Sequence, residues 1–175
     1  MTPHRLFTLW VALLVMLISV AQAPAQPKPQ ACGPDHAILY KRATSLLEKA
    51  QKKLNDKYTA EAKTLVKEAN SLFSILVKEC APTQQERELT EKELQQEAIN
   101  KKLSDDALAQ ADSLNKSAEE KLKKSQELDA KGQSDQATAL QRQAKGESER
   151  AQVQAIKAGI YALRNQEMIF RFLNK

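Results

Sequence analysis

The chain has 175 residues, 28% of them charged, and 27 Lys and Arg against 22 Asp and Glu give a formal net charge of +5. Acidic and basic residues are interleaved along the chain, which excludes the strong single-sign field of a nucleic-acid-binding protein. Aromatic residues make up only 5% of the sequence, so any core must be thin and built mainly from Leu and Ala.

The first 25 residues have the pattern of a signal peptide. Arg5 supplies a positive start, and residues 6–20 form an apolar run. That run has 15 residues, fewer than the ~20 that a helix needs to span a bilayer. Small residues precede two candidate cleavage points, and we favour the bond between Ala25 and Gln26, because Pro24 fits poorly beside a scissile bond. The alternative is a membrane anchor that is retained.

Residues 26–33 are expected to form a short extended leader, because their alternating prolines favour polyproline geometry. A first helix is predicted to begin near Pro34, with Asp35 in its first turn facing the positive helix end. Apolar side chains at helical spacing continue from there to Leu54. A turn is expected over residues 55–58, and a second helix should end at Pro82.

Cys32 and Cys80 are the only cysteines in the chain. Cys32 lies 25 residues before Lys57, at the centre of the predicted turn, and Cys80 lies 23 residues after it. An antiparallel hairpin with equal arms places these positions side by side, as a disulfide requires. The sequence therefore predicts a Cys32–Cys80 disulfide that closes a hairpin over residues 34–81, the alternative being two unpaired buried cysteines.

Residues 83–175 are predicted to form a longer hairpin. The sequence Thr83-Gln84-Gln85-Glu86 matches a capping box and should begin a helix that runs to Lys131. Gly132 then supplies a left-handed cap, and a further helix should run from Ser134 to about Phe172. Residues 104–106 have the composition of a second helix start, so the first of these helices is either continuous or kinked there.

Two faces are expected on the last helix. Ala137, Ala144, Ala151 and Ala158 recur every seven residues and form an alanine seam, which favours close packing against an antiparallel helix. A second apolar face lies away from the seam and requires a partner. This candidate interaction face consists of Val153, Ile156, Ile160, Leu163, Met168, Phe170 and Phe172.

These patterns predict an all-α fold made of two antiparallel helical hairpins, one short and clamped by the disulfide, the other long and similar to a coiled coil. Folding about Gly132 returns residue 172 to the neighbourhood of Cys80. We therefore expect a partial four-helix bundle at the end that the two hairpins share.

The chain lacks the residue patterns of common catalytic and cofactor sites. After removal of residues 1–25, His36 is the one remaining histidine, and we expect it on the surface. Because the cysteines are expected to be oxidised, we predict no metal site, and the four isolated glycines form no phosphate-binding loop. The expectation is a protein without catalytic residues or cofactors that is not an enzyme.

The sequence favours an exported helical protein of the bacterial envelope, periplasmic or secreted, that acts as a structural or protein-binding module. Its partner would be another protein or a second copy, reached through the candidate interaction face, with no nucleic acid and at most peripheral contact with membrane or wall. In length, charge and helicity the chain also resembles periplasmic chaperones with long helical arms. That resemblance implies a holdase-type chaperone as the alternative function.

Overall fold

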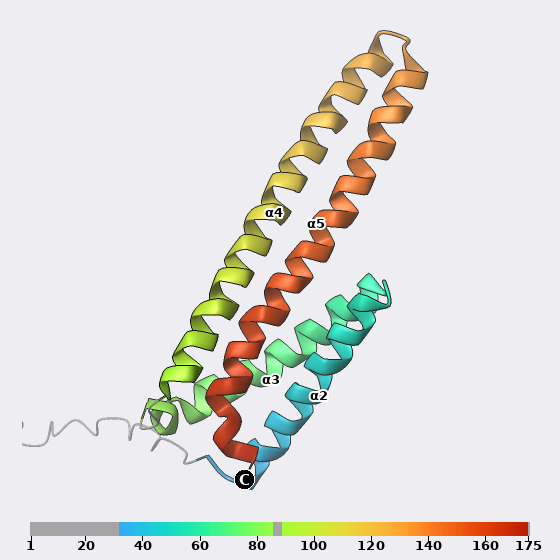
Figure 1. Cartoon of the computed structure of the whole chain (residues 1–175). Helices are drawn as coiled ribbons and strands as arrows, with labels where there is room; N and C mark the ends of the chain where they lie inside the picture. Colours follow the sequence, from blue (N-terminus) through green and yellow to red (C-terminus); the bar gives the residue numbers. More distant parts are fainter. Residues whose placement is uncertain (1–31, 86–88, 175) are drawn as a thin grey trace, which may run out of the picture. The chain divides into compact units, whose positions relative to one another are not determined.

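The computed structural model describes residues 32–85 and 89–174, and these form four α-helices and a short 3-10 helix (Figure 1). The α-helices are α2 (Pro34–Asn55), α3 (Thr59–Gln85), α4 (Glu91–Ala130) and α5 (Ser134–Ile169), and η1 (Phe170–Asn174) follows α5. No strand occurs in the described ranges. The predicted signal peptide, its cleavage point between Ala25 and Gln26, and most of the expected leader lie outside the described residues.

Helices α2 and α3 form the short hairpin, with its turn where the sequence predicts it. Lys57 has a φ of 66°, the left-handed conformation that reverses the chain in a single step. Tyr40, Leu47, Phe73 and Leu76 lie inside the hairpin, each at most 5% exposed. Helix α3 continues to Gln85, so the expectation that it ends at Pro82 is wrong. A proline removes one backbone donor, and a helix can continue past that missing bond.

The long hairpin begins later than predicted. Thr90, not Thr83, caps α4: its Oγ1 accepts a hydrogen bond from the backbone N–H of Glu93, and its own N–H donates to Glu93 Oε2 at 2.9 Å. Glu93 is 6% exposed and also pairs with Arg171 of η1. Two Thr-x-x-Glu motifs compete in this segment, and the tertiary ion pair of Glu93 favours the second.

Helix α4 is continuous through residues 104–106. Ser104 is buried, and its hydroxyl donates to the backbone carbonyl of Ala158 on α5 at 3.1 Å, so it joins the two helices instead of capping a new one. Gly132 has a φ of 76° and supplies the predicted left-handed turn. The alanine seam of α5 is buried as predicted, since all four of its residues are at most 2% exposed.

Helix α5 links the two hairpins. It packs along α4 on one side and against α2 and α3 on the other (Figure 1). The main core lies at this second contact and joins Tyr40, Phe73 and Leu76 of the short hairpin to Ile160 and Leu163 of α5 and to Phe170 of η1. The predicted fold class, with its two hairpins packed at a shared end, is confirmed.

Candidate functional site

The predicted disulfide is present at the root of the short hairpin. Cys32 and Cys80 are bonded, and their Cα atoms lie 5.4 Å apart. Cys32 precedes the first turn of α2, and Cys80 lies near the end of α3. Cys80 is completely buried and belongs to the main core, while Cys32 is partly buried against it. The bond therefore ties the start of α2 to the end of α3.

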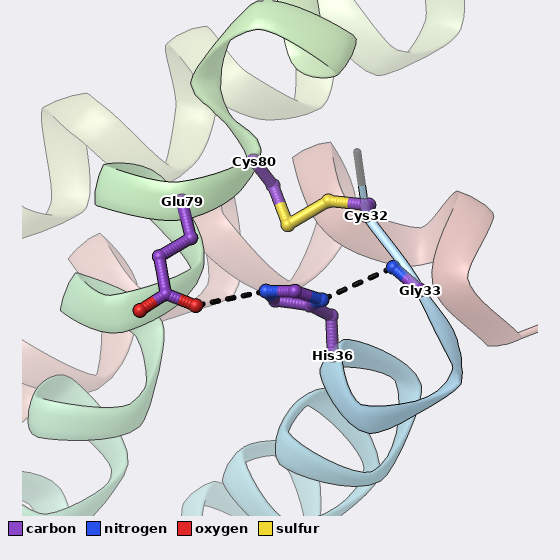
Figure 2. Close-up of a disulfide and its surroundings, with 5 residues drawn as sticks. All are labelled: Cys32, Gly33, His36, Glu79 and Cys80. Carbon is purple, nitrogen blue, oxygen red and sulfur yellow. Dashed lines mark hydrogen bonds and ion pairs between the residues drawn. A yellow bond between two sulfur atoms is a disulfide. The ribbon is translucent and has the colours of Figure 1, made fainter. Parts of the chain in front are cut away.

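His36 lies beside this disulfide, so the expectation of a surface histidine is wrong (Figure 2). The residue is 6% exposed. Its Nδ1 accepts a hydrogen bond from the backbone N–H of Gly33 at 3.1 Å, and its Nε2 lies 2.9 Å from Glu79 Oε2. Because Gly33 supplies a donor to Nδ1, the ring proton belongs on Nε2, from where it is donated to the Glu79 carboxylate.

The two sulfur atoms and a nitrogen of His36 form a cluster in which every ligand atom lies within 4.8 Å of the others. Oxidised sulfur atoms are not metal ligands, so in the disulfide form this cluster closes the hairpin. The only local signal for this cluster is that Cys32 and His36 lie four residues apart at the predicted start of α2. The part played by Glu79 has no such local signal, because it is separated from His36 by 43 residues.

The candidate interaction face lies mostly inside the protein. Ile156, Ile160, Leu163 and Phe170 are between 0 and 5% exposed, and they belong to the core formed with α2 and α3. Val153 and Phe172 are partly buried against the same core, and Met168 is half-buried. The short hairpin of this chain is therefore the partner that this face required.

Two cavities lie along α5, next to the buried face. The larger, of about 920 Å³, is bounded by the turn of the short hairpin (Lys57 to Glu61), by Leu114 of α4 and by Gly146 to Gln154 of α5. The second, of about 490 Å³, lies among Tyr40 of α2, Gln96 and Asn100 of α4 and residues 160–171. Val153 and Met168, both from the candidate interaction face, line the first and second cavity respectively.

Both cavities open on one side of α5. Val153 in the first cavity is seven residues before Ile160 in the second, and Gln154 stands in the same relation to Tyr161. Seven residues make about two helical turns, so these pairs share a face. We call the two cavities together the α5 groove, with α4 as one wall and the short hairpin as the other.

Basic residues follow the α5 groove at the same spacing. Arg150 lines the first cavity, Arg164 and Arg171 line the second, and the exposed Lys157 stands seven residues from both Arg150 and Arg164. Arg164 pairs with Glu167 at 2.6 Å, and Arg171 pairs with Glu93. Glu61 and Glu149 also line the first cavity. The sequence shows this seven-residue basic spacing, but nothing local indicates that it borders a groove.

Lys53 contacts two residues that line the turn end of the α5 groove, Glu61 and Tyr58. Its Nζ lies 2.6 Å from Glu61 Oε2 and 4.8 Å from the centre of the Tyr58 ring. Hydrogen bonding to Glu61 raises the pKa of Lys53 above its ordinary value of 10.5. This contact fixes both the carboxylate and the ring at the mouth of the larger cavity.

Comparison of the chain with protein-family models, with curated proteins and with solved structures finds no match. Within residues 32–85 and 89–174, no helix has the length and apolar content to cross a membrane. The Cys32–Cys80 disulfide is compatible with an oxidising, exported location.

Proposed function

We propose that the chain is an exported, non-enzymatic module of the bacterial envelope that binds an acidic amphipathic segment of another protein in the α5 groove. The observation that carries this proposal is the combination of apolar side chains in a mixed lining, namely Tyr58, Leu114 and Val153, with a row of basic side chains at helical spacing. Export, envelope location and the absence of enzymatic activity belong to the proposal. They are supported by the signal-peptide pattern of residues 1–25 and by the disulfide.

The walls of the α5 groove suit an apolar face. Leu114 and Val153 are partly buried, and Tyr58 is 55% exposed. One turn of a helix with a diameter of 10–12 Å fills roughly 400–600 Å³. The larger cavity of about 920 Å³ therefore has room for about two turns of a partner helix.

The charges favour an acidic partner. Arg150 and Lys157 are both exposed; Arg150 lines the first cavity, and Lys157 lies on α5 between the residues that line the two cavities. Of the two carboxylates that line the first cavity, Glu61 is paired with Lys53, and Glu149 adjoins Arg150 in the sequence. A partner helix with Leu on one face and Glu on the other would pack its apolar face against the lining of the groove and place its carboxylates near the basic side chains. This is the usual arrangement in helix-in-groove recognition.

The test uses a fluorescent synthetic peptide of Leu and Glu at helical spacing, with a Leu–Lys peptide of the same pattern as its counterpart. Anisotropy should show binding of the acidic peptide that weakens with salt. The double variant Arg150→Glu/Lys157→Glu should bind at least about tenfold more weakly, since it loses and reverses two charge contacts. Lys101→Glu/Lys123→Glu is the matched control, because it changes the charge equally at exposed positions outside the two cavities.

Equal affinity of the two double variants, or equal binding of the acidic and basic peptides, would rule out recognition in the α5 groove. If the acidic peptide does bind in the α5 groove, the natural partner can be identified by photocrosslinking in envelope preparations. A photoreactive residue at position 114 would crosslink to that partner or to a second copy of the chain, and one at position 94 serves as the comparison. Leu94 is 52% exposed and lies outside the groove, so it reports non-specific contact.

A holdase-type chaperone is the second candidate. It is favoured by exposed leucines elsewhere on α4, namely Leu94, Leu108 and Leu122, each between 43 and 52% exposed. Such surfaces hold unfolded chains without a defined groove. Suppressed aggregation of an unfolded outer-membrane protein, retained in Arg150→Glu/Lys157→Glu, would favour this function over a specific one.

A further inference from the structure

We propose that Cys32, His36 and Cys80 form a binding site for a thiophilic d10 cation, Zn²⁺ or Cu⁺, when the disulfide is reduced. This inference is independent of the α5 groove. It rests on the position of a buried histidine against both sulfur atoms and on the hydrogen bonds that orient its ring.

The three side chains are already gathered. Their ligand atoms lie within 4.8 Å of one another, and they come from the start of α2 and the end of α3 (Figure 2). Two thiolates and one imidazole are a soft ligand set, which selects Zn²⁺ and Cu⁺ over hard cations such as Mg²⁺ and Ca²⁺. With Zn²⁺, three protein ligands leave the fourth position to water, and partly buried Cys32 faces the solvent side of the cluster.

The outer hydrogen bond of His36 is one that a metal-binding histidine makes. A metal-binding histidine usually donates the proton of its other ring nitrogen to a carboxylate or a carbonyl, which fixes the tautomer. Here Nε2 lies 2.9 Å from Glu79 Oε2. The lone pair is thus on Nδ1, where the backbone N–H of Gly33 now binds at 3.1 Å. A cation would replace that N–H as the partner of Nδ1.

Formation of the site requires a reductant for the disulfide. A dithiol reductant gives two electrons and two protons to the Cys32–Cys80 bond, which yields two thiols here and a disulfide in the reductant. On binding a cation, the two thiols release two protons to solvent, while the imidazole keeps its Nε2 proton. The site has no net charge with Zn²⁺ and a single negative charge with Cu⁺.

The experiment reduces the purified chain with a phosphine, which takes oxygen from water and leaves no competing thiol. Zn²⁺ and Cu⁺ are then titrated separately against chromophoric chelators. We expect one cation per reduced chain and none per oxidised chain. His36→Asn and Cys80→Ser should weaken binding by more than about 100-fold, and Glu79→Gln by about tenfold, as removal of an outer partner does. Charge-transfer absorption between thiolate and Co²⁺ should confirm sulfur ligation and should change in His36→Asn.

The proposal is overturned by a reduced chain that takes up neither cation at a 1:1 ratio, and equally by a His36→Asn variant that binds as tightly as the natural chain. If reduction itself lowers the helix content, addition of the cation should restore it in the natural chain but not in His36→Asn. Helix content that is lost and not restored also counts against the site. Cys32→Ser/Cys80→Ser gives the helix content of the chain that can form neither the disulfide nor the site.

Discussion

The hydroxyl of Tyr40 on α2 donates a hydrogen bond to the backbone carbonyl of Glu167 on α5, at 3.1 Å and across 127 residues of sequence. The ring of Tyr40 also meets Phe73 edge-on, at 6.5 Å between ring centres. One side chain thus connects both helices of the short hairpin to the last α-helix.

Replacing Tyr40 with Phe should remove the hydrogen bond and keep the ring contact. The expected loss in the free energy of unfolding is about 0.5–1.5 kcal/mol, the usual net value of a hydrogen bond. Urea denaturation measures it. Tyr58→Phe is the control, because Tyr58 is 55% exposed and should change stability little. Equal effects of the two substitutions would mean that the bond to Glu167 contributes nothing.

Breaking the disulfide should destabilise the short hairpin before the long one. Closing the loop between Cys32 and Cys80, 48 positions apart, contributes about 4 kcal/mol in the chain-entropy model. In Cys32→Ser/Cys80→Ser we expect a lower melting temperature and faster amide hydrogen exchange in α2 and α3. Unchanged exchange in these helices would show that the bond is not what holds the root together.

The alanine seam should not accept larger side chains. Ala144 is 1% exposed, so Ala144→Leu forces a branched side chain between α4 and α5 and should cost about 1–3 kcal/mol. Ala155→Leu is matched to it in chemistry and lies on an exposed position of the same helix. Thermal unfolding of the two variants separates packing from helix propensity, and a tolerant Ala144 would argue against close approach of the helices.

Two glycines of α5 should respond differently to replacement by alanine. A Cβ at Gly159 would lie 3.0 Å from Val66 Cγ1 on α3, whereas a Cβ at Gly146 would meet nothing within 4 Å. Gly146→Ala should therefore gain about 0.5–1 kcal/mol from helix propensity. Gly159→Ala should lose some or all of that gain, because Val66 must shift. A full gain at both positions, measured by denaturation, would show that α3 does not approach α5 at Gly159.

The ion pair between Lys121 and Glu147 should make the free energy of unfolding depend on pH. Lys121 Nζ donates to Glu147 Oε1 at 2.7 Å, and this hydrogen bond lowers the pKa of Glu147 below its ordinary 4.5. A carboxylate with a lowered pKa in the folded state contributes stability above its unfolded pKa and loses it as pH falls. The difference in unfolding free energy between the natural chain and Glu147→Gln should therefore shrink as pH falls through and below 4.5. A difference independent of pH, or one matched by Glu119→Gln at an exposed position, would contradict this origin.

The features that the sequence predicts well are those that repeat locally. Ala137, Ala144, Ala151 and Ala158 form a buried line because seven residues are close to two helical turns, whatever lies opposite them. The disulfide follows from the nearly equal distances of Cys32 and Cys80 from the turn at Lys57. Neither inference requires knowledge of how the two hairpins pack.

The features that it misses depend on contacts between distant segments. Thr90 caps α4 because Glu93 is held by Arg171, 78 residues later, and Thr83 has the same local motif. His36 is buried because the end of α3 brings Glu79 and Cys80 over it. The α5 groove is lined by residues of four helices, so residue spacing within one helix cannot reveal it.

The position of α5 between the two hairpins has a consequence for the order in which the protein folds. Helices α2, α3 and α4 all precede α5 in the chain, so a short hairpin that folds first leaves Phe73 and Leu76 without the cover that Ile160, Leu163 and Phe170 provide. That apolar surface stays exposed until the last fifth of the chain has packed onto it. Exposed apolar surface of this kind is what makes partly folded chains prone to aggregate.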